Sequence, residues 1–456
     1  MKNTKVRSVI LYLLLLGFLF GIGYFVYSYV TNGKTWAVQP INKHLSSDKD
    51  IGGKIFDRNN VVLCQTVDGK RVYSDDELKR KALLHTVGDG PVLIPTSVQS
   101  RYNAEIYGYN LITGFGAPKR FSSSNDVKLT LDSDLCVTAL KGLGEQKGAV
   151  VVYNYLTGEV VCSVSTPTYD PNNRPDIEHE SSDKYDGVYI NRVLSGSYTP
   201  GSIFKIITCA AAIDNIDDIY QRKFLCNKEE DVSGDKITCM EHHGRIDLVN
   251  AMSKSCNIAF ADIAMEIGKD KMQQKAEEFG FNKKYTIDGV DIAESRYNAD
   301  NAKQVDLGWS GIGQYNDVVN PMHMLMIMGA IANEGVPVEP YMVKSVGIEK
   351  QDGIMNNRPK NMERMVSADT ANKIKDIMRY TIKNRYGDSM FPGMEMCAKT
   401  GTAEVGEGKQ PHGWMVGFSQ DKNFPYAFAV IVENSGFGIK TAGPIASDVM
   451  KSLHRK

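Results

Sequence analysis

The strongest pattern in the chain is an uninterrupted apolar stretch near its N-terminus. Residues 9–30 contain no charged side chain and follow three basic residues within the first seven positions. A run of about 22 such residues is long enough to span a bilayer, and flanking basic residues favour the cytoplasmic side. A cleaved signal peptide is the alternative, but the stretch is too long and no small-x-small site follows it. We therefore expect a cytoplasmic tail at 1–7, a transmembrane helix at 8–30 and an extracytoplasmic remainder anchored in the cell membrane.

Residues 31–127 contain short apolar stretches separated by turns. Apolar residues flank the Asn59-Asn60 pair within residues 54–64, which predicts a hairpin. Residues 75–85 predict one helix. No pattern of a nucleophile site or of a glycosyltransferase domain occurs in this region. We expect a small, β-rich N-terminal domain that is non-catalytic and acts as a pedestal or in dimerisation.

Residues 128–456 alternate between helical and strand patterns, which predicts an α/β (α+β) domain. The expected strands are 148–153, 159–165, 395–402, 414–419 and 426–433, and the expected helices are 132–145, 248–267, 321–333, 366–383 and 442–454. The last strands and the terminal helix favour an antiparallel sheet covered by helices, beside a separate helical cluster that carries Ser255.

One stretch of this region has the pattern of an activated nucleophile. Pro200 and Gly201 mark a turn, and mostly apolar residues follow as far as Ile213, so a buried helix is expected to begin at Ser202. Lys205 lies one turn further along the same face, within reach of the serine hydroxyl. A serine becomes a good nucleophile when a neighbouring base takes its proton. A lysine can be that base when burial or a second cation lowers its pKa.

Two further triplets complete the pattern. Ser-x-x-Lys occurs five times in the chain, but a long apolar helix follows it only at Ser202. Ser255-Cys-Asn257 lies in the next helical pattern, and Lys399-Thr-Gly401, the one Lys-Thr-Gly of the chain, lies in an expected strand. In this order the three triplets are similar to the signature of penicillin-binding proteins and class A β-lactamases.

The sequence resembles class B penicillin-binding proteins over most of residues 50–445. The further segments that carry the resemblance are Gly53–Asn59, Gly148–Asn172, Asn191–Ala212, Leu307–Gln314, Asn320–Met324 and His412–Phe418. The resemblance implies the penicillin-binding transpeptidase fold, with a five-stranded antiparallel sheet and a helical subdomain. It also implies a monofunctional, membrane-anchored serine-type D,D-transpeptidase that cross-links peptidoglycan during cell-wall synthesis.

The resemblance implies three catalytic residues. Ser202 would attack the carbonyl between the two D-alanines of a stem peptide and form an acyl-enzyme, which the amine of a neighbouring stem peptide then attacks. Lys205 is the candidate general base, although the identity of the base is disputed in related enzymes. Ser255 would relay a proton to the leaving nitrogen. β-Lactams imitate D-Ala-D-Ala and would acylate Ser202.

Five further residues are expected to bind the substrate. Asn257 would hydrogen-bond the substrate backbone and steady the general base. Lys399 would keep that base neutral by repulsion and attract the terminal carboxylate. Thr400 and Thr402 would offer hydroxyls to this carboxylate, and Gly401 would let the substrate lie close to the strand. The backbone N–H groups of Thr402 and the nucleophile form the expected oxyanion hole.

Other functions are compatible with the same triplets. A D,D-carboxypeptidase would use water as the acceptor. A β-lactamase needs a fast deacylation base, and no loop with a suitable glutamate is evident. A penicillin sensor or an inactive scaffold is a third alternative. His242, His243 and His412 could suggest a serine–histidine hydrolase, but no Gly-x-Ser-x-Gly elbow surrounds the candidate serine.

The expected partners follow from the charge and from the resemblance. A net charge of −1 gives no reason to expect nucleic acid. The resemblance implies peptidoglycan stem peptides ending in D-Ala-D-Ala, β-lactams, the membrane, and a glycan polymerase of the shape, elongation, division and sporulation (SEDS) type. A role in division, elongation or sporulation is left open.

The eight cysteines are scattered and form no C-x-x-C pair, so we expect neither a metal site nor a cofactor. Cys226 and Cys239 bracket one polar loop. They could form a disulfide outside the cell or stay as thiols. Cys256 and Cys397, within or beside the motifs, are interpreted as small buried residues.

Overall fold

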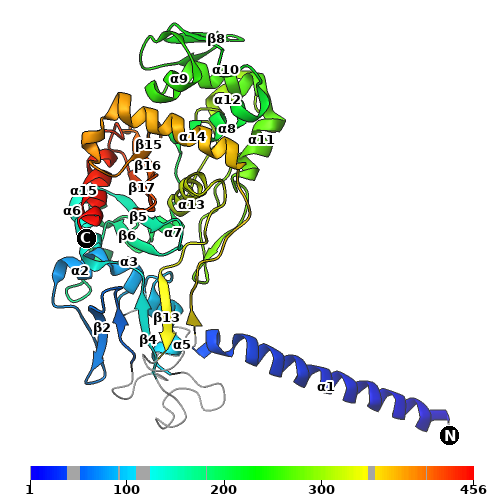
Figure 1. Cartoon of the computed structure of the whole chain (residues 1–456). Helices are drawn as coiled ribbons and strands as arrows, with labels where there is room; N and C mark the ends of the chain where they lie inside the picture. The colour runs from blue at the N-terminus through cyan, green and yellow to red at the C-terminus, as the bar shows by residue number, and fades with distance from the viewer. Residues whose placement is uncertain are drawn as a thin grey trace.

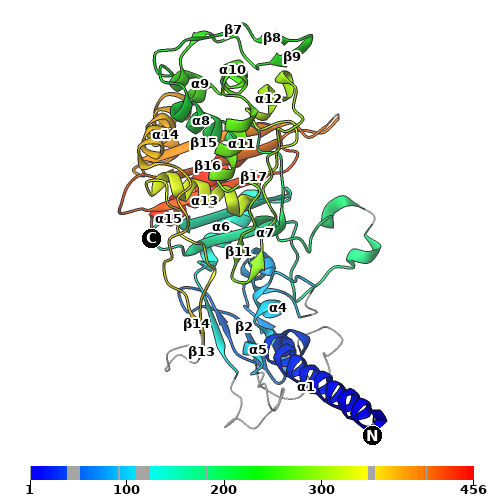
Figure 2. The ribbon, with the colours of Figure 1, turned by 90° about the vertical axis from the view of Figure 1, so that its right-hand side faces the viewer.

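The structure, a computed structural model, describes residues 2–37, 52–90, 93–108, 124–180, 182–347, 355–406 and 408–456. The other residues, which include parts of the expected N-terminal domain, lie outside this description. A long helix, α1 (Lys2–Ala37), extends away from the folded body (Figure 1, Figure 2). Its portion Val6–Gly33 is long and apolar enough to cross a membrane, and its most apolar window is not buried in the structure. Such a helix is consistent with a single-pass membrane anchor.

A five-stranded antiparallel sheet, in the order β15-β16-β17-β5-β6, forms the centre of the larger part of the molecule. Its strands are β15 (Met396–Ala403), β16 (His412–Ser419), β17 (Tyr426–Val432), β5 (Gly148–Asn154) and β6 (Val160–Thr166). Helices α6 (Ser133–Leu143) and α15 (Ala442–His454) lie on one face and α13 (Pro321–Ala332) on the other (Figure 1). The strands are almost wholly buried because both faces are covered. The predicted sheet covered by helices is confirmed.

A helical subdomain lies at the β15 end of the sheet (Figure 1). Its helices are α8 (Lys205–Asn215), α9 (Leu248–Lys254), α10 (Asn257–Ile267), α11 (Lys269–Glu278) and α12 (Gln304–Ser310). At its rim β7 (Phe224–Cys226) pairs with β10 (Gly244–Ile246), and β8 (Glu229–Val232) pairs with β9 (Asp235–Thr238). Between subdomain and sheet, α14 (Ala368–Thr381) covers β15. The sheet edge and this subdomain therefore face each other.

A second sheet, of six strands, lies between α1 and the larger domain (Figure 2). In spatial order it contains β14 (Met355–Asn356), β13 (Val343–Gly347), β4 (Asp126–Leu129), β1 (Ile55–Phe56), β2 (Val62–Val67) and β3 (Lys70–Tyr73). β1 and β2 form the hairpin predicted around Asn59-Asn60. β13 and β14 follow α13 in the chain, so the chain returns to this sheet late. The boundary expected between residues 127 and 128 falls inside β4.

Short helices flank this second sheet. They are α2 (Glu77–Ala82), α3 (Leu84–Val87), α4 (Val98–Arg101) and α5 (Asn103–Ile106), and a further short helix, α7 (Arg192–Ser195), packs on the larger sheet. The single helix predicted over 75–85 is wrong, because Leu83 leaves the helical region at ψ 6° and separates α2 from α3.

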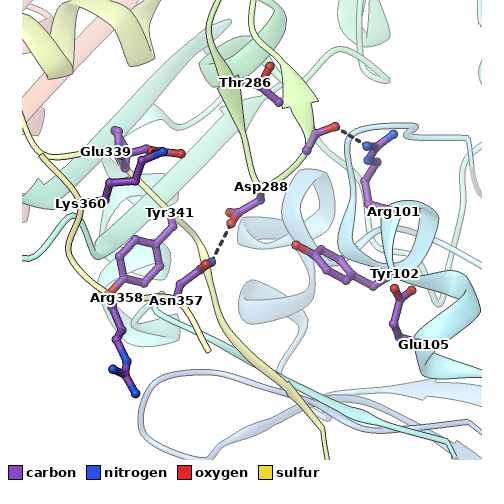
Figure 3. Close-up of a pocket in the computed structure, with 12 residues that line it drawn as sticks. Arg101, Tyr102, Glu105, Thr286, Asp288, Glu339, Tyr341, Asn357, Arg358 and Lys360 are labelled. Atoms are coloured by element: carbon purple, nitrogen blue, oxygen red, sulfur yellow. Dashed lines mark hydrogen bonds and ion pairs between the residues drawn. The ribbon is translucent and has the colours of Figure 1, made fainter. Parts of the chain in front are cut away.

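A pocket of about 500 Å³ lies between the larger domain and the region of the second sheet (Figure 3). Asp288, in the turn between β11 (Thr286–Ile287) and β12 (Val290–Asp291), points into this junction. Its carboxylate accepts hydrogen bonds from the backbone N–H groups of Met342 (2.6 Å) and Val343 (3.2 Å) and from Asn357 Nδ2 (3.3 Å). One partly buried carboxylate thus connects a hairpin of the larger domain to the start of β13.

Candidate active site

The three triplets of the sequence meet in one cleft of about 420 Å³ between β15 and the helical subdomain. One comes from the turn before α8, one from the junction of α9 and α10, and one from β15 itself. The residues that line the cleft include Ser202, Ser255, Asn257, Thr400, Thr402, Trp309, Gln314, Arg385, Tyr386 and Phe437. Segments far apart in the sequence therefore converge on the edge of the sheet.

Ser202 lies in a 3-10 turn, Gly201–Ile203, and α8 begins only at Lys205. The prediction that the helix begins at Ser202 is therefore wrong by one turn. The reason is Gly201, whose φ of +55° is left-handed. A Cβ atom on Gly201 would lie 2.5 Å from the carbonyl oxygen of Thr402, so only glycine fits this close to β15. The tight turn brings Ser202 Oγ to 3.1 Å from Lys205 Nζ.

Ser255 and Asn257 lie between two helices rather than inside one. α9 ends just before Ser255, which has left-handed angles (φ 57°, ψ 41°), and Cys256 then precedes α10. The single helix predicted over 248–267 is wrong here, because a left-handed residue cannot continue a right-handed helix. The break turns three oxygens toward Lys205 Nζ: the carbonyl (2.8 Å) and hydroxyl (3.2 Å) of Ser255 and Oδ1 of Asn257 (2.7 Å).

Lys399 reaches the same hydroxyl from the sheet. Its side chain is fully buried, and its Nζ donates to Ser255 Oγ (2.9 Å) and to the carbonyl of Thr400 (2.9 Å). Ser255 Oγ thus lies between two amines, since Lys205 Nζ is 3.2 Å away on the other side. A hydroxyl held this way can accept a proton from one amine while it gives its own to a neighbour. The two lysines and Ser255 form a proton path that ends at Ser202.

Burial sets the protonation of the two lysines. It lowers the pKa of Lys205 to about 8, because desolvation disfavours the ammonium form. The hydrogen-bond partners of Lys205 are neutral oxygens, so none restores the charged form as a carboxylate would. Burial also lowers the pKa of Lys399, and repulsion from Lys205 and Arg385 adds to the effect. A neutral amine beside a serine hydroxyl is what general-base activation requires.

The third triplet forms the wall of the cleft. β15 is the edge strand of its sheet, and the N–H of Thr400 leaves the sheet to donate to the Tyr386 hydroxyl (3.2 Å). Because edge N–H groups point the same way at every second residue, the N–H of Thr402 also faces outward. A Cβ on Gly401 would lie about 3.0 Å from Ile203 and from the carbonyl of Pro200, so this position has little room for a side chain.

Several residues of the cleft were not among the predicted site residues. Tyr386 ends the turn of helix that follows α14, and its hydroxyl lies 2.8 Å from Thr400 Oγ1. Arg385 precedes it and contributes to the low pKa of Lys399. Trp309 and Phe437 add apolar surface to the cleft from α12 and from the segment after β17. Trp309 lies in the segment Leu307–Gln314 that carries the family resemblance, whereas the other three belong to no such segment. Only the folded chain brings all four to the site.

All eight predicted site residues lie together. Five line the cleft, Lys205 and Lys399 lie beneath it, and Gly401 packs against the turn that carries Ser202. His243 lines the same cleft, but no histidine that the structure describes is hydrogen-bonded to the hydroxyl of the nucleophile. Among the described residues Ser202 Oγ has a hydrogen bond only with Lys205, while the ring of His412 packs edge-on against Tyr198.

Known proteins share this arrangement of the chain. The penicillin-binding protein transpeptidase domain matches residues 148–451. Peptidoglycan D,D-transpeptidase PbpA of Mycolicibacterium smegmatis is 29% identical over 326 residues, which are 67% of this chain and 66% of that protein. This chain therefore spans just under two thirds of the length of that relative.

Two solved structures have the same fold. The D,D-transpeptidase domain of a peptidoglycan glycosyltransferase from Eggerthella lenta is 26% identical, with a TM-score of 0.77 over 90% of this chain and 99% of that one. Penicillin-binding protein A from M. tuberculosis, solved as a ceftriaxone acyl-enzyme complex, is 23% identical, with a TM-score of 0.76 over 90% of this chain and 99% of that one. The similarity covers both the larger domain and much of the N-terminal region.

Proposed function

The chain belongs to the penicillin-binding protein transpeptidase family, and on this premise we propose that it is a serine-type D,D-transpeptidase that cross-links peptidoglycan stem peptides. The observation that carries the proposal is the buried amine of Lys205, 3.1 Å from the hydroxyl of Ser202. The name of the mycobacterial relative, a peptidoglycan D,D-transpeptidase, supports the same activity. The acyl-enzyme described for the M. tuberculosis protein supports covalent binding of β-lactams.

Acylation begins when Lys205, as the neutral amine, takes the proton of Ser202. The serine oxygen forms a bond to the carbonyl carbon between the two D-alanines, and the bond from that carbon to the leaving nitrogen breaks. Ser255, in contact with the amines of Lys205 and Lys399, passes a proton to the leaving D-alanine. The enzyme then holds an ester on Ser202, with the proton balance restored.

Transfer reverses these roles. The amine of a neighbouring stem peptide attacks the ester carbon, loses a proton to Lys205 and forms the new peptide bond. Ser202 leaves as the alkoxide and regains its proton through Lys205. Because acylation and transfer use the same base, the geometry of Lys205 matters to both steps.

The other residues of the cleft bind the substrate. Lys399 and the hydroxyls of Thr400 and Thr402 attract the terminal carboxylate of the donor peptide. Asn257 donates to the substrate backbone while its Oδ1 steadies the general base. The outward N–H of Thr402, together with that of the nucleophile, stabilises the oxyanion of the tetrahedral intermediate. Removal of a comparable donor costs about 100- to 1,000-fold in rate.

The proposal is tested on purified full-length protein. A fluorescent penicillin is expected to label the wild type covalently and to leave Ser202→Ala unlabelled, while circular dichroism shows that both are folded. Labelling that survives Ser202→Ala would exclude this nucleophile. With stem pentapeptide and an acceptor amine, cross-linked dimers are the expected product. Trimmed monomers alone would favour the D,D-carboxypeptidase, and rapid hydrolysis of the adduct would favour a β-lactamase.

The proposal includes the location of the chain in the membrane and its protein partner. Helix α1 anchors the chain once in the cell membrane, residues 1–7 stay in the cytoplasm, and residues 31–127 and 128–456 act outside it. The exposed apolar surface of α1 and the non-catalytic second sheet support contact with a SEDS-type glycan polymerase. Co-purification of that polymerase with the wild type, and its loss when α1 is replaced by an unrelated transmembrane helix, would support this partner. Equal recovery with both would contradict it.

A further inference from the structure

Three cysteines and one histidine gather beside the active site. Cys226 ends β7, Cys239 follows β9, His243 precedes β10, and Cys256 lies before α10. Their ligand atoms all lie within 4.8 Å of one another. The three cysteines are buried free thiols, so the possible Cys226–Cys239 disulfide is not formed in the structure. Four separate segments thus bring sulfur and nitrogen ligands to one point.

Two of the spacings within the cluster match those of a tetrahedral metal site. Nδ1 of His243 lies 3.5 Å from the sulfur of Cys226 and 3.5 Å from the sulfur of Cys239. Zinc bonds of about 2.3 Å to sulfur and about 2.0–2.1 Å to nitrogen place tetrahedral ligand atoms roughly 3.5–3.8 Å apart. A Cys₃His set with this spacing is typical of structural zinc.

We propose that Cys226, Cys239, His243 and Cys256 bind one Zn²⁺ ion as a closed structural site. Four protein ligands leave no open position, so the ion would hold the fold together rather than activate water. Binding releases the three thiol protons and leaves the imidazole neutral. The expectation of no metal relied on the absence of C-x-x-C, and the spacing C-x12-C-x3-H-x12-C hides the set in the sequence.

The surroundings of the cluster suit a metal site. The side chain of His243 is only 3% exposed, and its Nε2 lies 3.8 Å from a carboxylate oxygen of Glu241. When Nδ1 binds a metal, the opposite N–H faces this carboxylate, an arrangement common around zinc-bound histidine. The backbone N–H of Asn257 donates to the sulfur of Cys239 (3.3 Å). Hydrogen bonds of this kind stabilise a thiolate ligand.

The ion would position two residues of the active site. Cys256 lies directly between Ser255 and Asn257, the two residues whose oxygens surround Lys205. Asn257 is tied to the same cluster through its N–H to Cys239 and through its Nδ2 to the carbonyl of Thr238 (2.8 Å). Backbone hydrogen bonds from Ser255 to Met252 (3.2 Å) and from Cys256 to Ala251 (2.9 Å) close the left-handed turn at Ser255. The metal would hold the position of this turn relative to the rest of the cluster.

Metal content tests the site directly. Full-length protein, purified in detergent with reductant and without chelator, is expected to contain about one zinc per chain by mass spectrometry of metals. Cys226→Ser and His243→Ala are expected to lose it. Cys64→Ser, a buried thiol of the second sheet, is the matched control and should keep the full content. Because no turnover is needed, a failure here leaves the assignment of Ser202 untouched.

A second measurement uses the wild type, so it remains valid if a variant fails to fold. Wild-type protein whose metal is exchanged for Co²⁺ should show the thiolate charge-transfer absorption and the intense visible bands of tetrahedral cobalt. In folded Cys226→Ser, the rate of penicillin acylation should fall by about 10- to 100-fold, as is usual when metal-site support is lost. If the wild type contains no zinc after incubation with Zn²⁺ and reductant, the proposal is wrong. A native mass lower by two hydrogens, which indicates a disulfide, would also overturn it.

Discussion

Two pockets of this molecule are similar in size, and each adjoins a buried titratable side chain whose neighbours differ. The active-site cleft has about 420 Å³ and the junction pocket between the domains about 500 Å³. Each adjoins a titratable side chain that is partly or fully buried and has no ion-pair partner among the described residues. Beside the cleft this is Lys205, which is fully buried, and in the junction it is Asp288, which is partly buried (Figure 3).

Burial shifts the two groups toward their neutral forms. It lowers the pKa of Lys205 to about 8 and raises the pKa of Asp288 to about 6. The difference lies in the neighbours. Lys205 contacts a hydroxyl that opens into a cleft, whereas Asp288 accepts hydrogen bonds from the backbone at the start of β13. A perturbed pKa indicates a catalytic site only where a reactive group lies within hydrogen-bond distance.

The largest effect is expected from removal of the base. Lys205→Met should slow acylation by penicillin by about 100- to 10,000-fold, because no neutral amine then takes the proton of Ser202. Stopped-flow measurement of adduct formation gives the rate. Lys271→Met, at an exposed position on α11, is the matched control and should react as the wild type. A Lys205→Met rate within a few-fold of wild type would assign the base to another group.

The pH profile of acylation sharpens the comparison. Below the pKa of about 8, Lys205 carries a proton and cannot accept another, so the rate should rise about tenfold per pH unit as the pH increases. Above this value the amine is neutral and the rate should level off. Asp288→Asn should leave the profile unchanged. A rate that is flat from pH 6 to pH 9 would contradict a titrating lysine.

A smaller effect is expected at the wall of the cleft. Tyr386→Phe removes the hydroxyl that lies 2.8 Å from Thr400 Oγ1 and accepts from the Thr400 N–H. The loss of such hydrogen bonds, about 0.5–1.5 kcal/mol each, corresponds to roughly a two- to tenfold slower acylation. Rates at saturating and limiting penicillin separate weaker binding from slower chemistry. An unchanged rate would mean that Thr400 needs no support from Tyr386.

The smallest effect is expected in the junction and concerns stability alone. Because the pKa of Asp288 is higher in the folded chain than its ordinary value of 3.8, its contribution to stability is present below that value and is lost as the pH rises through about 6. Asp288→Asn should remove this dependence, with a difference of about 1 kcal/mol between pH 4 and pH 7 after allowance for solvent screening. Urea unfolding at the two pH values measures it, with acylation at Ser202 unchanged. Parallel pH dependence in both proteins would contradict the assignment.

Apolar periodicity predicted the strands of the larger sheet, and the three motifs predicted eight residues in or beside the cleft. The amine of Lys205 contacts the hydroxyls of Ser202 and Ser255. Lys399 reaches the hydroxyl of Ser255 from β15, which forms where the apolar pattern predicts a strand. Apolar periodicity is a local property, so it finds strands and helices well. The three triplets share one known catalytic chemistry, so they indicate which distant segments of the chain must be in contact.

What the sequence could not predict depends on contacts between distant segments. The break at Ser255 interrupts an apolar run that reads as one helix, and it turns the Ser255 hydroxyl toward two lysines from distant segments. The metal cluster requires β7 to pair with β10, which sets Gly244 opposite Cys226. Tyr386 reaches the cleft only through the turn after α14. None of these long-range contacts produces a recognisable pattern in the local sequence.

The late return of β13 and β14 to the second sheet has a consequence for biogenesis. β4 is flanked by β1 and by β13, so one of its edges stays unpaired until residue 347 has been synthesised. The early segment of the nascent chain cannot mature as an autonomous unit, and a fragment that stops before α13 would expose an open strand edge to other chains. Completion of the second sheet is therefore coupled to translation of the chain beyond α13.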